Sequence, residues 1–173
     1  MFAVVGEKPS GRVISAMMVV VVAGGLTIGA AMGVRQTFGL FLGPFSFDRG
    51  IPVTLFAFAV ALHNIVWGIA QPFAGAAADR YGAAPVVAFG GIAFAAGLAL
   101  AALVPSGAML VLGMGLLVGI GISCTSFGVV MISVGQVASA KQRSMAMGLA
   151  SAGGSVGQIL IVPLAQGVTN SWG

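Results

Sequence analysis

The chain has 173 residues, of which 59% are hydrophobic and only 6% are charged, and its mean hydropathy is +1.13. An average soluble domain has about 25% charged residues, so this chain has too few charges to cover a water-facing surface. These values exclude a soluble globular domain, a disordered tail and a nucleic-acid-binding module. They predict an all-α integral membrane protein.

The seven basic side chains outnumber the three acidic ones and give a net charge of +4. They occur scattered along the chain rather than in a stripe, which argues against a nucleic-acid partner. Glycine is abundant at 28 residues, and small residues inside apolar runs let transmembrane helices pack closely. The single cysteine, Cys124, lies inside an apolar run and is expected to be a packing residue.

A helix that spans a bilayer needs about 20 mostly apolar residues. Charged residues and a Pro-Ser-Gly turn at 105–107 divide this sequence into five such runs. The predicted spans lie at about 13–43, 53–78, 84–104, 108–133 and 144–168. Residues 1–12 then form a segment before the transmembrane bundle of 13–168, and residues 169–173 follow it. The first run is too long for a cleaved secretory signal, so it is expected to be retained.

Five spans place the two ends of the chain on opposite sides of the membrane. With the N-terminus inside, the inner side holds five basic residues and the outer side holds two, Arg35 and Arg49. The inner set is Lys8, Arg12, Arg80, Lys141 and Arg143. The positive-inside rule therefore predicts a multi-pass protein of the inner (plasma) membrane with a cytoplasmic N-terminus.

Polar side chains occur in four of the five spans and are absent from residues 85–104 in the third. Because such side chains are costly in hydrocarbon, we expect four helices to surround a polar interior, with the third span outside them. At a rise of about 1.5 Å per residue, Arg35 and His63 lie about 14 and 15 Å below the outer ends of their helices. Gln158 lies about 21 Å from the inner end of its helix.

These depths place several polar residues in one layer near the bilayer midplane, where a carrier holds its solute. The layer contains Arg35, Gln36, His63, Asn64 and Gln158. On the second span, Asn64, Trp67 and Gln71 share one helix face because they are spaced at i, i+3 and i+7.

Five of these residues also have a purely structural interpretation. Arg35 can snorkel to the outer interface instead of binding a buried anion. His63 can be a neutral packing residue instead of a proton-coupling group, and Trp67 can pack instead of stacking on a solute. Asn64 and Gln158 can simply tie helices together through modest interhelical hydrogen bonds. The sequence leaves these alternatives open.

Glycines recur every four residues on three spans, which gives each a smooth face for close helix packing. They are Gly25, Gly29 and Gly33 on the first span, Gly115 and Gly119 on the fourth, and Gly153 and Gly157 on the fifth. Smooth faces also allow helices to rock against each other, as alternating access requires.

The segment Gly75-Ala-Ala-Ala-Asp79-Arg80-Tyr81-Gly82 lies between the second and third spans. Gly82 permits a tight turn, and Asp79 would suit the positive N-terminal end of a helix. The segment resembles the G-x-x-x-D-R-x-G signature of the major facilitator superfamily, although residues 83–85 lack the basic side chains of that pattern. The resemblance implies five transmembrane helices of the N-terminal half of a major facilitator fold. It also implies a cytoplasmic latch at Gly75, Asp79, Arg80 and Gly82 that holds two halves together in the outward-facing state.

Three further stretches resemble bacterial carriers of the monocarboxylate and oxalate/formate group: residues 33–44, residues 70–74, and residues 152–158 with Pro163. In that group a basic residue of the first helix often takes part in anion transport, and Arg35 matches its position. A guanidinium can read a carboxylate through paired hydrogen bonds. Gly115 replaces an arginine of many proton-coupled members, and Gln158 replaces the proline of export antiporters, so drug–proton antiport is not favoured.

The resulting hypothesis is the N-terminal part of a secondary active transporter that moves a small organic anion, a monocarboxylate or dicarboxylate, by alternating access. Its expected partners are the solute, with proton coupling left open, the lipid bilayer and the missing C-terminal helices of the full carrier. The chain is therefore expected to be incomplete and inactive alone. The expected substrate-binding residues are Arg35, Gln36, His63, Asn64, Trp67 and Gln158.

The alternatives are a drug or sugar carrier of the same superfamily and a non-transport membrane scaffold protein. An enzyme is not expected, because one histidine and three acidic residues that share no helix face provide neither a metal site nor an acid–base pair. No catalytic residue, metal or cofactor is expected.

Overall fold

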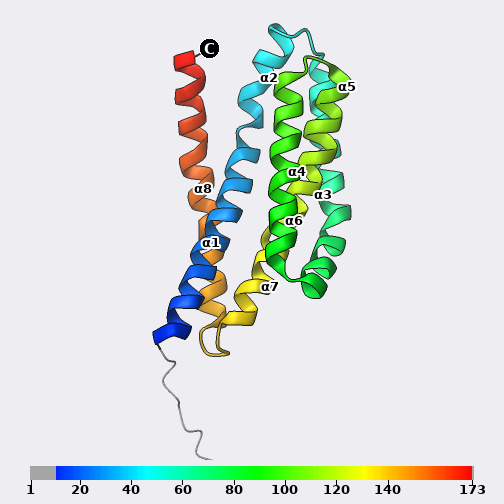
Figure 1. Cartoon of the computed structure of the whole chain (residues 1–173). Helices are drawn as coiled ribbons and strands as arrows, with labels where there is room; N and C mark the ends of the chain where they lie inside the picture. The colour runs from blue at the N-terminus through cyan, green and yellow to red at the C-terminus, as the bar shows by residue number, and fades with distance from the viewer. Residues whose placement is uncertain (1–10, 173) are drawn as a thin grey trace, which may run out of the picture.

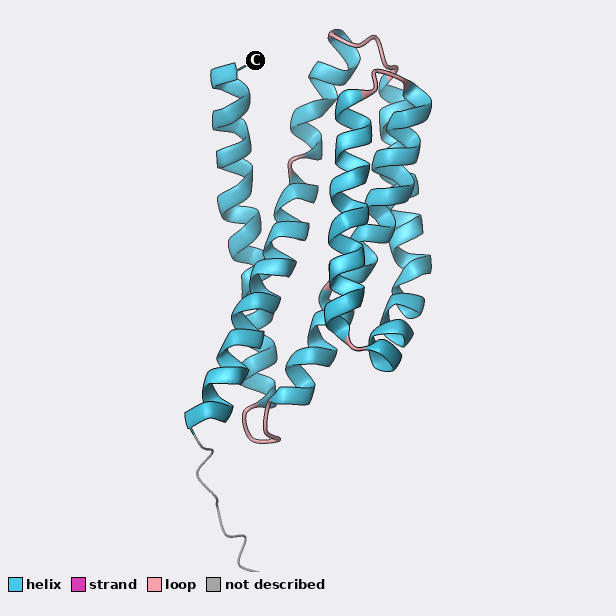
Figure 2. Ribbon diagram, in the orientation of Figure 1, coloured by secondary structure: helices cyan, strands magenta, loops and turns pink. Residues whose placement is uncertain are grey.

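The computed structural model describes residues 11–172 and contains only helices and their connections within that range (Figures 1 and 2). The segment 1–12 that the sequence places before the bundle falls almost wholly outside it. Five stretches are long and apolar enough to cross a membrane: Ala16–Phe47, Val53–Tyr81, Ala83–Leu103, Gly107–Val137 and Arg143–Ser171. The predicted all-α fold with five transmembrane helices is confirmed.

The first span is two helices, α1 (Gly11–Gln36) and α2 (Phe38–Phe47), separated at Thr37. There the backbone N–H of Thr37 donates to the carbonyl of Val34 at 3.0 Å, and the Thr37 hydroxyl donates to the same carbonyl at 2.7 Å. This tight turn replaces the regular i to i−4 bonding of an α-helix. Arg35 therefore lies in the last turn of α1, directly before the interruption.

The second and third spans are α3 (Val53–Tyr81) and α4 (Ala83–Leu103). They are separated at Gly82, whose φ of 87° and ψ of 156° end α3 because this region of backbone space is essentially restricted to glycine. One face of α4 packs against α3 and the fourth span and is buried. The buried residues recur at helical spacing: Ala83, Val86, Gly90, Ala93, Gly97 and Ala101. Its other faces are largely exposed, so the third span lies at the edge of the described bundle. The second and fifth spans are no more buried than the third, so burial does not set the third span apart from the others.

The fourth span is interrupted twice, although the sequence predicts one continuous helix over 108–133. It begins with α5 (Gly107–Leu110) and a π-helical segment, η1 (Val111–Leu117), and continues as α6 (Val118–Thr125). Ser126 then adopts an extended conformation, with φ of −83° and ψ of 178°, before α7 (Phe127–Val137). Interrupted helices and π-segments are common at functional sites in membrane proteins.

The fifth span, α8 (Arg143–Trp172), packs along α1 through what we call the glycine seam, formed by Gly25, Gly29, Gly33, Gly153 and Gly157. A Cβ atom added to Gly29 would lie 2.7 Å from the Gly153 carbonyl oxygen, and one added to Gly33 would lie 2.6 Å from that of Gly157. The two backbones are therefore in direct contact. In Figure 1 the far half of α8 diverges from the rest of the bundle.

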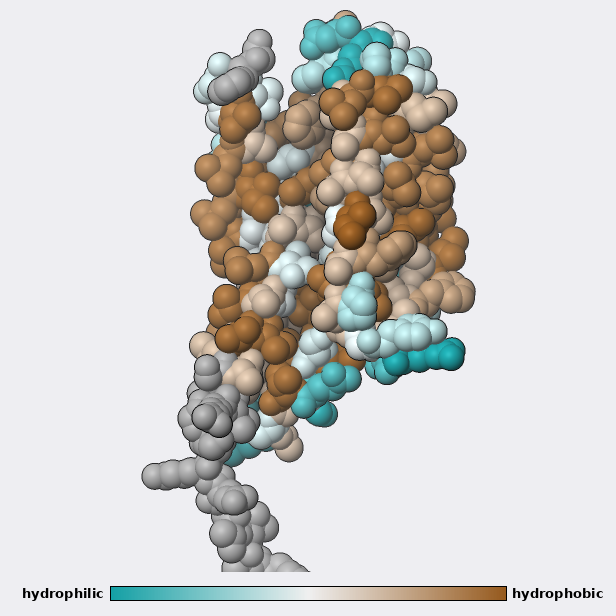
Figure 3. All heavy atoms as spheres, viewed as in Figure 1, coloured by the Kyte–Doolittle hydropathy of each residue, from teal (hydrophilic) through white to brown (hydrophobic). Residues whose placement is uncertain are grey.

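The distribution of side chains is that of a protein surrounded by lipid. Large apolar side chains are exposed along the spans, including Phe73, Ile92 and Ile159 at 71% each. The buried polar residues are Thr37, His63, Ser123, Thr125 and Ser126. Figure 3 shows an apolar surface along the length of the bundle, with hydrophilic residues gathered near its two ends. The chain is a multi-pass membrane protein.

Candidate functional site

Arg35 projects from the end of α1 toward α3. Its Nη1 donates a long hydrogen bond of 3.4 Å to Oδ1 of Asn64, and its Cζ lies 5.4 Å from the centre of the Trp67 ring. A guanidinium within about 6 Å of a tryptophan ring is attracted to the face of that ring. Arg35 is 12 residues before the end of α2 at Phe47, or about 18 Å along the helix axis, and its contacts are with α3 rather than with groups at the helix end.

Within residues 11–172, the positive charge of Arg35 has no carboxylate beside it. The part of the chain that the structure describes contains two acidic side chains, Asp48 and Asp79, and both are exposed at the ends of helices. Nε of Arg35 is buried and has no hydrogen-bond partner among residues 11–172. A charged group inside a transmembrane bundle is costly unless it is paired. The geometry therefore suits a negatively charged ligand.

His63 is completely buried, and neither of its ring nitrogens has a hydrogen-bond partner within the described chain. Its ring meets the edge of the Phe38 ring at 5.7 Å between centroids and an interplanar angle of 76°. The backbone of His63 packs closely on Gly119, where an added Cβ atom would lie 3.0 Å from the His63 carbonyl oxygen. Buried polar atoms are nearly always satisfied in native proteins, so these two nitrogens are candidates for contact with a ligand.

Arg35 and the buried His63 border one recess of about 420 Å³ between α1, α2 and α3, which we call the Arg35 recess. Its polar lining is Arg35, Gln36 and His63, and its apolar lining is Phe38, Gly39, Leu42, Val53, Phe56, Ala57 and Val60. A mostly apolar cavity with a few convergent polar groups is typical of a small-molecule site. The recess can take a small organic molecule that has one negatively charged end.

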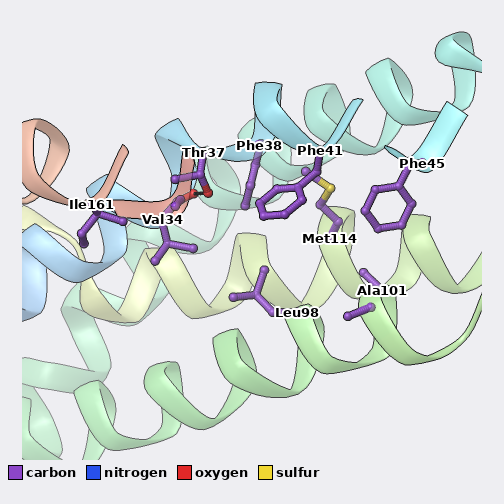
Figure 4. A pocket seen from close by; sticks show the side chains of 11 residues that line it. Val34, Thr37, Phe38, Phe41, Phe45, Leu98, Ala101, Met114 and Ile161 are labelled. Carbon is purple, nitrogen blue, oxygen red and sulfur yellow. Dashed lines mark hydrogen bonds between the residues drawn. The ribbon is translucent and has the colours of Figure 1, made fainter. Parts of the chain in front are cut away.

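A second cavity, of about 270 Å³, lies between α2, α4, η1 and α8. Figure 4 shows the rings of Phe41 and Phe45 on the same side of this cavity, facing Leu98 and Ala101 across it. Its one polar side chain, Thr37, already donates its hydroxyl to a backbone carbonyl. None of the described residues that line this cavity offers a charged or free polar group with which to recognise a solute, so the recognition chemistry lies in the Arg35 recess.

Trp67 is held in place by a hydrogen-bond network that was not predicted from the sequence. Its Nε1–H donates to Oε1 of Gln71 at 2.7 Å, and the hydroxyl of Ser126 donates to the same oxygen at 2.9 Å. The signal for Gln71 was its helical spacing from Asn64 and Trp67. Ser126 is one of the polar side chains of the fourth span, but nothing in the sequence paired it with Gln71, because that contact follows from the interruption of the span.

The structure thus brings five of the expected substrate-binding residues together, since Gln36 and His63 line the Arg35 recess and Asn64 and Trp67 contact Arg35. Gln158 is not among them. It is half-buried on α8, and no hydrogen bond links its side chain to another described residue. Among residues 11–172, no group of three His, Cys, Asp or Glu side chains could hold a metal ion.

The segment that resembles the latch signature lies at the end of the bundle where α1 begins. Asp79 does not begin a helix of its own: α3 continues to Tyr81, so Asp79 lies in the last turn of α3. Asp79 instead lines a groove together with Arg143, whose Nη2 donates to the carbonyl of Gly135 at 2.7 Å. Arg80 stacks on the ring of Tyr81, with its Cζ 5.2 Å from the ring centre.

A comparison with protein families finds that the family described as the Major Facilitator Superfamily matches residues 24–173. The match includes every residue of the Arg35 recess and of the latch segment, and it is to the superfamily as a whole rather than to one of its branches. No curated protein and no solved structure matches the chain.

Proposed function

The chain belongs to the Major Facilitator Superfamily, and from this premise we propose that it forms part of a secondary transporter for a small organic anion. The superfamily consists of membrane transporters rather than enzymes, so the activity assigned to the site is movement of a small molecule across the membrane. One observation carries the choice of an anion: among the residues that the structure describes, the buried Nε of Arg35 has no hydrogen-bond partner and no carboxylate lies beside the guanidinium.

The solute class we propose is a monocarboxylate or dicarboxylate. A carboxylate can accept paired, charge-assisted hydrogen bonds from one guanidinium. The 3.4 Å contact between Arg35 and Asn64 is longer than an ordinary hydrogen bond, so a carboxylate would displace it at little cost. Gln36 and His63 supply further polar groups on the same recess, and its apolar wall would take the carbon body of the solute. The imidazole of His63 also gives this site a route to proton coupling.

We further propose that the transporter needs helices beyond these 173 residues. The Arg35 recess is walled by α1, α2 and α3 alone, whereas alternating access requires a solute to be enclosed and then released on the other side. The chain alone is therefore expected not to transport.

The proposed orientation puts the start of α1 in the cytoplasm of a cell whose inner membrane contains the protein. Arg80, Lys141 and Arg143 lie at that end of the bundle, whereas Arg49 lies at the other, and positive residues favour the cytoplasmic side. The groove that joins Asp79 to Arg143 would then face the cytoplasm, where a latch at Gly75, Asp79, Arg80 and Gly82 would act.

Binding of radiolabelled acetate and oxalate to the chain in lipid nanodiscs tests this proposal. Replacing Arg35 with glutamine should weaken binding by about 10- to 150-fold, the factor that a hydrogen bond to a charged group contributes. Arg49→Gln is the matched control: Arg49 also stacks on an aromatic ring, with Cζ 4.8 Å from the centre of the Phe45 ring, but it donates to the Ala101 carbonyl at the end of the bundle.

Equal weakening by the two substitutions would overturn the assignment of the site to Arg35. Binding of a neutral sugar or a cationic dye, independent of Arg35, would favour the sugar- or drug-carrier alternative instead. Binding of none of these molecules would overturn the anion site that we assign to this chain. Saturable acetate uptake by liposomes that contain this chain alone would contradict the proposal that further helices are needed.

A further inference from the structure

Arg35 is connected to the interruption of the fourth span through a chain of side-chain contacts. The guanidinium lies over the ring of Trp67, the indole N–H of Trp67 donates to Gln71, and the hydroxyl of Ser126 donates to the same amide oxygen. These four residues come from the first, second and fourth spans. Gln71 is the one that contacts both the ring beside Arg35 and the break between α6 and α7.

Gln71 fits tightly into this break. A Cβ atom added to Gly128 would lie 2.6 Å from Nε2 of Gln71, so the amide lies directly against the first turn of α7. Its oxygen accepts from Ser126, the residue whose extended conformation separates α6 from α7. A movement of α7 relative to α6 would therefore shift both Ser126 and Gly128, the two residues of the fourth span that contact the Gln71 side chain.

The orientation of Trp67 depends on Gln71. An indole N–H that is removed from water requires an acceptor, and Oε1 of Gln71 provides it at 2.7 Å. This bond fixes how the ring faces Arg35. The remaining polar contact of the Arg35 side chain is the 3.4 Å bond to Asn64, so the position of the ring has a large influence on where the guanidinium lies.

We infer that Gln71 is a positioning residue of the anion site: it holds Trp67 against Arg35 and connects anion binding there to the break of the fourth span at Ser126. The inference rests on the proposed anion-binding function. A Gln71 that served only to tie helices together would affect the stability of the bundle but not the affinity of Arg35 for an anion.

Tryptophan fluorescence can separate these two roles, because the chain has two tryptophans and Trp172→Phe leaves Trp67 as the single reporter. The probes are iodide, an anionic quencher that Arg35 can bind beside the ring, and acrylamide, a neutral quencher. Both are titrated against the chain in lipid nanodiscs. The quantity measured is the ratio of iodide quenching to acrylamide quenching.

In the Trp172→Phe background, Arg35→Gln should abolish the excess of iodide quenching over acrylamide quenching. Gln71→Met should lower the ratio by about two- to tenfold, the factor that one hydrogen bond contributes. Ser126→Ala should lower it in the same direction, and Ser126→Thr should retain the parent ratio because it keeps the hydroxyl. Gln166→Met is the matched control, since it removes a comparable glutamine hydrogen bond, from Gln166 Nε2 to Asn170 Oδ1 at 3.0 Å on α8.

A parent ratio in Gln71→Met, together with a loss in Arg35→Gln, would overturn the positioning role and leave the proposed anion site intact. A parent ratio in Arg35→Gln would overturn the anion site itself. Should Gln71→Met fail to fold, the Ser126 pair decides: equal ratios in the alanine and threonine variants would overturn the connection to the break.

Discussion

Replacing Gly29 with alanine tests the close packing of α1 on α8. The added Cβ atom would lie 2.7 Å from the carbonyl oxygen of Gly153, whereas ordinary contacts of a Cβ atom begin at 3.4 Å. Because the neighbour is backbone rather than a flexible side chain, the two helices must separate by about 0.7 Å at this point. Overpacking of this kind typically destabilises by about 1–3 kcal/mol.

For a chain of this length such a loss lowers the melting temperature by about 2–12 °C, which can be measured by thermal unfolding of the purified chain in nanodiscs. Gly39→Ala and Gly167→Ala are the matched controls, because they lie in the same two spans and an added Cβ atom would meet no other group within 4 Å. If Gly29→Ala had the same melting temperature as these controls, α1 and α8 would not approach each other as described.

Three other predictions each concern a single residue. Gly82→Ala should destabilise the chain by about 1–3 kcal/mol because Gly82 occupies a glycine-only backbone region, whereas Gly75→Ala, at an uncrowded helical position, should not. Titration with sodium dodecyl sulfate measures the stability of both variants, and equal stability would contradict the prediction. Arg143→Gln should cost about 1 kcal/mol in the same assay by removing the bond to the Gly135 carbonyl, and an unchanged midpoint would show that the bond contributes nothing. His63→Leu should leave the melting temperature equal or higher, because it removes two unsatisfied nitrogens, yet weaken acetate binding; a destabilised variant with full binding would contradict the role given to His63.

The number and order of the spans could be predicted from the sequence because charged residues and turn residues separate its apolar runs. Asp48-Arg49 and Lys141-Gln142-Arg143 mark two of the connections, and the turn at 105–107 marks a third. The end of the last helix was less predictable. α8 continues to Trp172. Within its last turns the hydroxyls of Thr169 and Ser171 donate to carbonyls one turn earlier, and these polar residues do not interrupt the helix.

The interruptions of the helices could not be predicted in the same way. Ser126 is followed by no proline, and its hydroxyl contacts Gln71 of another span and the carbonyl of Ser123, contacts that the sequence does not show. The glycine repeats indicated which faces are smooth, but not that α1 would pair with α8. Residue spacing likewise gave the depth of Gln158 in the membrane, whereas the direction in which it points around α8 depends on the packing of the seam.

The central claim is that the guanidinium of Arg35 binds a carboxylate inside the bundle, and solid-state NMR can measure that contact. The experiment records the dipolar coupling between ¹³C-carboxyl acetate and ¹⁵N-guanidinium arginine in the chain embedded in lipid. Paired hydrogen bonds predict a carbon–nitrogen separation of about 4 Å, with a coupling that disappears in Arg35→Gln and persists in Arg49→Gln. A coupling that survives Arg35→Gln, or none in the unaltered chain at saturating acetate, would contradict the account.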